Sequence, residues 1–401
     1  MTNMHRIFLA ADSGQPMSAL ARRAAAGAAE LGWADPGLRA HEGRRAQQLL
    51  ETAAEAVATS VGAPGSAVIF LPAPMLALTA AVLASGQGPA VCGAADRLPV
   101  IAAIARRAHQ LGVTPSQLDV DSTGCVQVTA LAGAMASGAR VLVSQAGNPE
   151  VGSVADHVAL SSCVKDHNGV VVMDATMMAG RMPLPNPELW DVLVLSAASW
   201  AGGAGVGIVV LKPGTPWDAD SAWGADSHTL AQQPVRAPGV AACATAALSL
   251  EAAISTVAQR DLRDRRRTDA IRGALATVPG VAVHGRETRL PHVVGFSAAG
   301  VLAETLLLDL DRRGICVAAG SACTSDPGAP STVLTAMGAP TGGNVRITLP
   351  FDDEVLCGAA SPVADQPGDS VRDSNEFAEA AIAHVCAVLP EAIAAVRAEL
   401  V

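Results

Sequence analysis

The chain has 401 residues and a formal net charge of −10, and half of its residues are apolar. A chain of this length can form two or three domains with a substantial core, and its apolar fraction is too high for a disordered protein. The acidic balance, without a basic cluster, argues against a nucleic-acid partner, because phosphate binding requires clustered Lys and Arg. No run of about 18 uninterrupted apolar residues occurs, so we expect no membrane span.

Eight cysteines are scattered along the chain, without a Cys-x-x-Cys pair or the spacing of a zinc site. We therefore predict no metal site. The segment Met1–Ala11 has too short an apolar stretch for a secretory signal, so reduced thiols in the cytoplasm are the expectation. Only two lysines occur, Lys165 and Lys212, and any chemistry that needs a side-chain amine has these two candidates.

Short apolar runs alternate with helical stretches over the first part of the chain, which indicates α/β units around a mainly parallel sheet. Several of these runs are apolar throughout, so helices should cover both faces of the sheet. The expected strands are 67–71, 90–93, 141–144, 170–173, 192–195 and 207–211. The expected helices between them include 44–61, 100–111 and 155–164.

The pattern from Pro238 to about Thr277 is that of one long helix. Beyond it lies a second set of elements, which indicates a smaller α+β domain. Its expected strands are 281–284, 293–297, 315–318 and 345–349, its helices 302–313 and 376–399, and its loop 358–374. We predict a large α/β domain over residues 15–258 and a small domain over residues 259–401, which also includes residues 1–14.

Several motifs occur together and in order. The first half of the chain contains Glu42–Arg45, Glu150–Gly152, Asp174–Thr176 and Gly202–Gly207, and the second half contains Arg289–His292, Gly314–Ser325, Pro330–Gly338 and Asn344–Leu349. Together they resemble the cysteine desulfurases of the NifS/IscS type, in the class V aminotransferase group of pyridoxal phosphate (PLP) enzymes. The resemblance implies a PLP-dependent transferase fold of type I, α/β, with a mainly parallel seven-stranded sheet and a smaller α+β C-terminal domain.

In that family a lysine holds PLP as a Schiff base, and a loop cysteine takes sulfur from the substrate cysteine as a persulfide, leaving alanine. The resemblance maps the loop cysteine onto Cys323 and the arginine that binds the substrate carboxylate onto Arg346, whose planar fork suits a carboxylate. An ion pair within the small domain is an equally good interpretation of Arg346. The residues around Cys323 indicate an exposed loop, whereas the seven other cysteines are expected to be small buried apolar residues.

The cofactor positions depart from the family pattern. The lysine position holds Ser199 and the histidine before it is Ala198, and a serine cannot form an imine. Neither Lys165 nor Lys212 is a convincing replacement, because ligands of a parallel sheet bind beyond the carboxyl ends of its strands. At the phosphate turn, residues 71–76, two prolines lack N–H groups and Met75 stands in place of a hydroxyl residue.

The ring contacts also differ. The stacking histidine aligns with Arg97, the glutamine at the ring hydroxyl with Met177, and the asparagine of the Asn-Asn-Glu motif with Pro149. Asp174, the partner of the pyridine nitrogen, and Ser196, a phosphate contact, remain as vestigial cofactor contacts.

A second phosphate-binding threonine aligns with Pro234. The methionines 75, 177 and 178, together with Trp200, would fill much of the cofactor's space. We therefore expect that PLP is absent.

Three functions remain open. The first is a sulfur (persulfide) carrier or transferase, or an iron–sulfur assembly partner, that acts through Cys323 and hands sulfur to an acceptor protein or scaffold. The second is a non-catalytic pseudoenzyme that forms a homodimer, or that serves as dimer partner or scaffold for an active desulfurase, because the family forms dimers. The third is a PLP-dependent cysteine desulfurase whose site is misaligned here.

Overall fold

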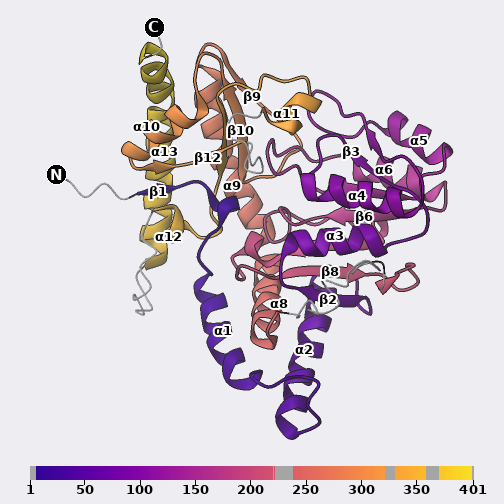
Figure 1. Ribbon diagram of the computed structural model, residues 1–401. Helices are drawn as coiled ribbons and strands as arrows, with labels where there is room; N and C mark the ends of the chain where they lie inside the picture. Colours follow the sequence, from indigo (N-terminus) through magenta and orange to yellow (C-terminus); the bar gives the residue numbers. More distant parts are fainter. Residues whose placement is uncertain (1–5, 220, 222–237, 321–329, 358–369, 400–401) are drawn as a thin grey trace.

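The computed structural model describes residues 6–219, 221, 238–320, 330–357 and 370–399 (Figure 1). A seven-stranded sheet forms its larger part, in the order β2-β8-β7-β6-β5-β3-β4. Strand β8 runs antiparallel to its two neighbours, and the other strands run parallel to one another. The strands are β2 (Ala67–Leu71), β3 (Ala90–Gly93), β4 (Ser116–Leu118), β5 (Val141–Gln145), β6 (Val170–Asp174), β7 (Val192–Ser196) and β8 (Gly207–Leu211). The mainly parallel seven-stranded sheet is confirmed.

Both faces of this sheet are buried. Alternate residues of β7 point to opposite sides, so that Leu193 and Leu195 belong to one core and Val192 and Val194 to the other. Helices α3 and α4 cover the second of these faces, and α2, α5, α6 and α8 pack on the first. The helices are α1 (Ala19–Leu31), α2 (His41–Ser60), α3 (Pro74–Ala84), α4 (Leu98–Gln110), α5 (Val128–Ala136), α6 (His157–Lys165) and α8 (Val240–Ser255).

A four-stranded antiparallel sheet forms a second core, in the order β12-β13-β10-β9. Its strands are β9 (Val281–Val283), β10 (Val293–Ala298), β12 (Ala318–Ala319) and β13 (Asn344–Thr348), and β1 (Ile7–Phe8) pairs with β11 (Ile315–Cys316) beside it. The helices are α9 (Val257–Ala276), α10 (Ala303–Arg312), α11 (Thr332–Ala336), α12 (Asp353–Leu356) and α13 (Ser370–Glu399). The division into two domains at residue 258 stays a prediction.

Three expectations about single elements were wrong. The long helix predicted to span Pro238 to Thr277 is two helices, α8 and α9, which meet at an angle of 73°. Thr256 lies at the break, and its hydroxyl bonds back to the carbonyl of Ala252, which competes with continuation of the helix. The strand expected at 315–318 is divided between two sheets, and the last helix begins at Ser370 instead of residue 376.

By length and composition, the segment Asn375–Ala398 of α13 could cross a membrane. Ile382, Leu389 and Ile393 of this segment are buried in the core of the small sheet. The bent pair of α8 and α9 passes the same test only if the two helices are taken as one span.

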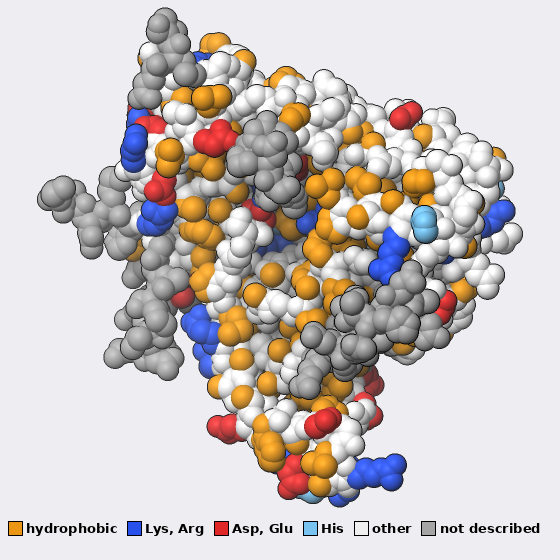
Figure 2. All heavy atoms as spheres, viewed as in Figure 1, with side chains coloured by type: hydrophobic (Ala, Val, Ile, Leu, Met, Phe, Trp, Pro, Cys, Tyr) orange, Lys and Arg blue, Asp and Glu red, His pale blue; other side chains and the backbone are white. Residues whose placement is uncertain are grey.

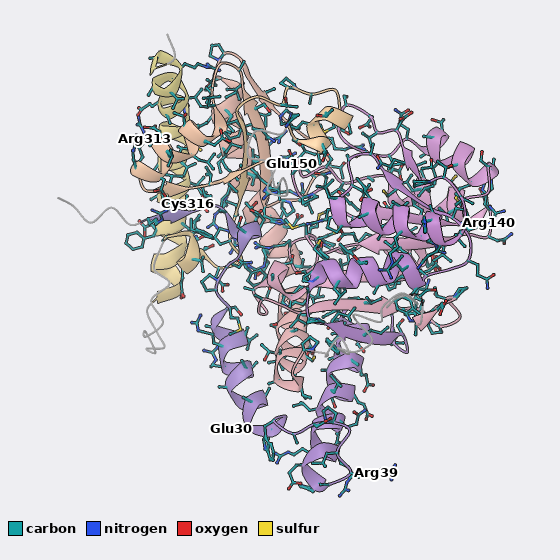
Figure 3. The ribbon with its side chains drawn as sticks, viewed as in Figure 1. Glu30, Arg39, Arg140, Glu150, Arg313 and Cys316 are labelled. Carbon is teal, nitrogen blue, oxygen red and sulfur yellow. The ribbon has the colours of Figure 1, made fainter. Side chains whose placement is uncertain are left out.

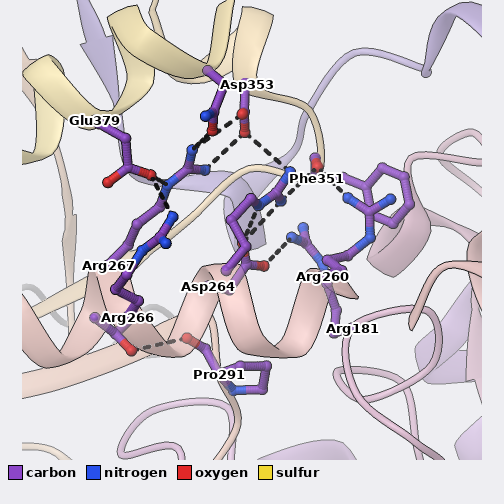
Figure 4. A network of polar contacts seen from close by, with 12 residues as sticks. Arg181, Arg260, Asp264, Arg266, Arg267, Pro291, Phe351, Asp353 and Glu379 are labelled. Atoms are coloured by element: carbon purple, nitrogen blue, oxygen red, sulfur yellow. Dashed lines mark hydrogen bonds and ion pairs between the residues drawn. The ribbon is translucent and has the colours of Figure 1, made fainter. Parts of the chain in front are cut away.

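A network of arginines and carboxylates connects the two sheets (Figure 4). Arg181, which follows β6, is 1% exposed and lies 3.7 Å from the carboxylate of Asp264 on α9. The guanidinium of Arg260 stacks on the ring of Phe351 at 3.5 Å, and Arg267 binds both oxygens of Asp353. Burial lowers the pKa of Arg181 to about 9, and the carboxylate of Asp264 opposes this effect.

Candidate functional site

The candidate site residues gather at the carboxyl edge of the large sheet. Asp174 ends β6, Ser196 ends β7, and Gln145 at the end of β5 lies in register with Asp174. A short 3-10 helix, Ala197–Trp200, follows β7 and carries Ala198 and Ser199. This edge is where a parallel sheet binds its ligands, so the predicted positions are together in space.

Arg97 forms an ion pair with Asp174. The guanidinium Nε lies 3.4 Å from Oδ2 of Asp174, and Nη2 donates to the hydroxyl of Thr176 at 3.3 Å. The other carboxylate oxygen of Asp174 accepts hydrogen bonds from the backbone N–H and the hydroxyl of Thr176. Asp174 is 3% exposed, so a cation from the chain itself neutralises a buried carboxylate.

Ser199 and Ala198 take part in contacts within the protein. The hydroxyl of Ser199 donates to the carbonyl of Ala179 at 2.9 Å, and its carbonyl accepts from Nε of Arg181 at 2.7 Å. The carbonyl of Ala198 accepts from the side-chain amide of Gln15. The residue at the lysine position therefore helps to hold the loop after β6 against the end of β7.

Both lysines of the chain lie at the opposite edge of the sheet. Because β8 is antiparallel to β7, its last residue Leu211 pairs with Val192 at the start of β7. Lys212 follows there and donates to the carbonyl of Pro187 at 3.0 Å, and Lys165 donates to the carbonyl of Glu188. One length of β7, roughly 13 Å, separates this edge from Ser196.

The turn at residues 71–76 has few groups to offer a phosphate. Helix α3 begins at Pro74 and has no side-chain cap. Gly207 lies so close to this turn that a Cβ there would stand 2.6 Å from the carbonyl oxygen of Ala73. Ser196 remains, buried at the end of β7, and Pro234 lies outside the described residues.

The predicted filling of the cofactor's space by four apolar residues is not seen as one cluster. Met178 and Trp200 are buried in the core on one face of the large sheet, with Met177 packed against it. Met75 packs against the core on the other face. The indole of Trp200 donates to the hydroxyl of Ser249 on α8, which fixes the ring beneath the site.

Arg346 is held by an ion pair of its own. Its guanidinium bonds to the carboxylate of Asp12, in the short 3-10 helix Ala11–Ser13, and the two side chains are 6% and 9% exposed. Nη1 of Arg346 also lies 3.5 Å from the carbonyl of Pro149. Of the two interpretations of Arg346, the ion pair with a carboxylate is the one present in this structure.

Cys323 lies outside the described residues, so its surroundings are not described. The expectation that the seven other cysteines are buried was only partly right. Three of them are buried and four are half-buried, the latter being Cys163, Cys316, Cys357 and Cys386. Among the described residues, no group of three or more His, Cys, Asp or Glu side chains could hold a metal ion.

The aminotransferase class-V profile matches residues 38–353 of the chain. The chain belongs to the class V aminotransferase family. It is 26% identical over 309 residues to a cysteine desulfurase of Nostoc sp., covering 75% of this chain and 77% of that protein. It is 28% identical over 323 residues to the cysteine desulfurase IscS of Dictyoglomus turgidum, covering 77% of this chain and 80% of that protein.

Solved structures agree on the fold of this class V aminotransferase. A NifS-like protein superposes with a TM-score of 0.76 at 18% identity, covering 96% of this chain and 99% of the other. A NifS-like protein from Rickettsia africae gives 0.73 at 18% identity, covering 95% and 99%. The NifS/IscS-like resemblance and the type I PLP-transferase fold are therefore confirmed.

Class V aminotransferases normally depend on PLP. The described residues of this member do not fit that group. Neither lysine lies at the carboxyl edge, Asp174 already has Arg97 as its cation, and Pro74 begins the helix at the phosphate turn without an N–H to donate. We derive no reaction step through PLP for this chain.

Sequence reasoning missed several partners at this edge. Thr176 and Asp12, which bind Asp174 and Arg346, were not predicted, although Thr176 stands in the quoted Asp-Ala-Thr motif. Glu150 lies between the two sheets (Figure 3), where its carboxylate accepts hydrogen bonds from Ser331 at 2.6 Å and Asn344 at 2.7 Å. Burial raises the pKa of Glu150, and the two hydrogen bonds oppose this shift.

Proposed function

We propose that this cysteine desulfurase-like protein carries sulfur as a persulfide on Cys323 and works without PLP, in the cytoplasm. The observation that supports this most is the placement of both lysines at the amino edge of the large sheet, bonded to the carbonyls of Pro187 and Glu188. A Schiff base needs an amine at the other edge, where Ser199 stands.

The ion pair of Arg97 with Asp174 supports the same proposal, because the carboxylate that would face a pyridine nitrogen has a partner within the chain. Arg346, which would bind the carboxylate of a substrate cysteine, is bonded to Asp12. Amine chemistry and substrate binding are thus both weakened, whereas the Ser-Ala-Cys-Thr-Ser sequence around Cys323 is complete.

In this role Cys323 accepts sulfur that a partner protein has already mobilised. The thiolate attacks the outer sulfur of the donor persulfide, a new S–S bond forms, the donor's S–S bond breaks, and the donor leaves as a thiol with the proton of Cys323. The products are a persulfide on Cys323 and a reduced donor, with no net oxidation. An acceptor protein or an iron–sulfur scaffold then takes the sulfur.

The test is incubation of the protein with a persulfide-loaded active cysteine desulfurase, followed by alkylation and peptide mass analysis. Cleavage at arginine gives a peptide over residues 314–346 that holds Cys316 and Cys323, and fragment ions distinguish them. We expect one added sulfur on Cys323, its loss in C323S and its retention in the matched control C316S. A label on Cys316 alone, or none on this peptide, contradicts the proposal.

An exposed apolar surface favours a second role as partner of another chain. Trp33, between α1 and α2, is 72% exposed, and Leu38 nearby is 50% exposed. Figure 2 shows apolar side chains over this projecting end, and Leu248 on α8 is also 47% exposed. We propose association with a second copy or with an active desulfurase, which light scattering and co-purification with a desulfurase test. A chain that is monomeric alone and in that mixture contradicts this role.

A further inference from the structure

A small polar cavity lies beside the Arg97–Asp174 pair, between the carboxyl ends of β3 and β5 and residues 124–126. Its volume of about 20 Å³ holds a single water-sized group. Asp96, Ser144, Gln145 and Cys125 are among the residues that line it. Because Gln145 is the register partner of Asp174, the cavity belongs to the same edge of the sheet as the candidate site.

Asp96 has one carboxyl oxygen without a partner. Asp96 is 5% exposed, and its Oδ2 accepts a hydrogen bond from the backbone N–H of Gly93 at 2.8 Å. The other oxygen, Oδ1, has no hydrogen-bond partner among the described residues. A buried oxygen of this kind indicates that the cavity takes a hydrogen-bonding group.

Burial raises the pKa of Asp96 to about 7, with the charge of Asp174 adding to the shift and the side-chain amide of Gln145, the N–H of Gly93 and the charge of Arg97 opposing it. A substantial fraction of Asp96 is therefore protonated at neutral pH. In that form its carboxyl group can donate a hydrogen bond to a group in the cavity.

Cys125 is held in the cavity wall by its own loop. The carboxylate of Asp121 accepts hydrogen bonds from the backbone N–H groups of Thr123 and Cys125, at 2.8 and 3.1 Å. Cys125 is 7% exposed, and its sulfur accepts a hydrogen bond from Nη1 of Arg286 at 3.8 Å. Arg286 lies between β9 and β10, so this contact also joins the two sheets.

The other two buried thiols have different surroundings. Burial raises the pKa of Cys243 to about 12 and that of Cys92 still further. Neither residue lines the cavity at Asp96. Among the three buried thiols of the described chain, Cys125 is the one whose sulfur has a positively charged group, the guanidinium of Arg286, within hydrogen-bond distance.

We propose that Cys125 is a second sulfur-accepting thiol, whose persulfide places its outer sulfur in the cavity lined by Asp96 while Sγ keeps its contact with Arg286. The proposal rests on the function proposed above, since it takes the chain to be one that handles persulfide sulfur. Nη1 of Arg286 donates a hydrogen bond to Sγ of Cys125, and the thiolate is the form of a cysteine that attacks. The cavity has room for one additional atom beside Sγ and excludes a bulky adduct.

The donor is hydrogen disulfide, a persulfide without an organic group, which suits a cavity of about 20 Å³. The thiolate of Cys125 attacks one of its sulfurs, a new S–S bond forms, and the S–S bond of the donor breaks. The other sulfur leaves as hydrogen sulfide with the proton of Cys125, so the step is a sulfur transfer without net oxidation.

The experiment uses inorganic disulfide (sodium disulfide) with the intact chain, followed by alkylation of the denatured protein and peptide mass analysis. Cleavage at arginine gives a peptide over residues 108–140 whose only cysteine is Cys125, and one over residues 46–97 whose only cysteine is Cys92. We expect one added sulfur on Cys125 in the wild type and in C323S, and an unmodified Cys92.

Two variants test the cavity itself. R286M keeps much of the side chain's bulk without its charge and should lower the labelling rate of Cys125 about tenfold. The control R289M removes an arginine of the same loop that binds Asp269 instead, and should label like the wild type. Circular dichroism of each variant confirms that it is folded.

An unlabelled Cys125, labelling no greater than that of Cys92, or equal labelling in R286M and R289M overturns the proposal. The outcome at Cys323 is scored separately, because it lies on a different peptide. If Cys125 is labelled and Cys323 is not, the carrier role proposed for Cys323 is wrong and the proposal for Cys125 is supported. If Cys323 is labelled and Cys125 is not, only the proposal for Cys125 is wrong.

Discussion

Arg97 and Asp174 lie in an ion pair at the carboxyl edge of the large sheet, 3.4 Å apart, with Thr176 bonded to both. The pair brings together the end of β6 and the residue before α4, which are far apart in the sequence. A buried carboxylate is stable only with a cation or hydrogen bonds to satisfy it. In this chain Arg97 supplies the cation and Thr176 supplies the hydrogen bonds.

Removing the charge of Arg97 should therefore destabilise the fold. Asp174 is 3% exposed, and in R97M its carboxylate would keep Thr176 as its main partner without a cation, so we expect a loss of about 2–3 kcal/mol in the free energy of unfolding. Urea unfolding measures this loss. The matched control is R106M, an exposed arginine on α4, which should change stability by less than about 0.5 kcal/mol. Equal losses of stability in R97M and R106M would show that the ion pair of Arg97 with Asp174 contributes nothing to the stability of the fold.

The ion pair between Asp12 and Arg346 predicts that substitutions of these two residues have strongly coupled effects on the free energy of unfolding. Both side chains are more than nine-tenths buried, so R346M or D12N alone should cost about 3 kcal/mol, by leaving one charge unpaired. The double variant should cost much less than the sum of the two. A double-mutant cycle in urea measures the coupling, which we expect to exceed about 1 kcal/mol. Additive effects would contradict the account of Arg346 as a residue bound within the protein.

Asp96 predicts a particular dependence of stability on pH. Its pKa in the folded chain is about 7, against 3.8 as the reference value, so the folded state binds more protons between these two values. Its contribution to stability is present below about pH 4 and is lost as the pH rises toward 7. The difference in unfolding free energy between wild type and D96N should therefore shift by a few kcal/mol across this window. A difference that is constant with pH would show that Asp96 does not titrate there.

Much of the fold was predictable because both faces of the large sheet are buried. Strands such as Val170–Asp174 and Val192–Ser196 are apolar up to their last residue, and each was expected within one residue of its observed bounds. The edge strand Ser116–Leu118 was missed, because two of its three residues are exposed and carry no apolar pattern. The break at Thr256 was missed because no Gly or Pro separates the two helices, although α8 is mostly apolar and α9 is rich in arginine.

The site was predictable as a set of positions and unpredictable as a set of contacts. The motif order placed Asp174, Ser196 and Ser199 at one edge, which the structure shows. The pairing of Arg97 with Asp174 and of Arg346 with Asp12 depends on how distant segments approach, which spacing along the sequence does not contain. Asp12 comes from a three-residue 3-10 helix near the start of the chain, without any motif to mark it.

The central claim is that no side-chain amine of this chain captures PLP at the carboxyl edge of the large sheet. Its most direct test is the absorption spectrum of the purified protein incubated with PLP, followed by borohydride reduction, dialysis and peptide mass analysis. We predict no specific imine absorbance and no reduced pyridoxyl group on the peptides that carry Lys165 or Lys212 beyond that of a denatured control. A stoichiometric yellow adduct that reduction fixes on either lysine would contradict the account.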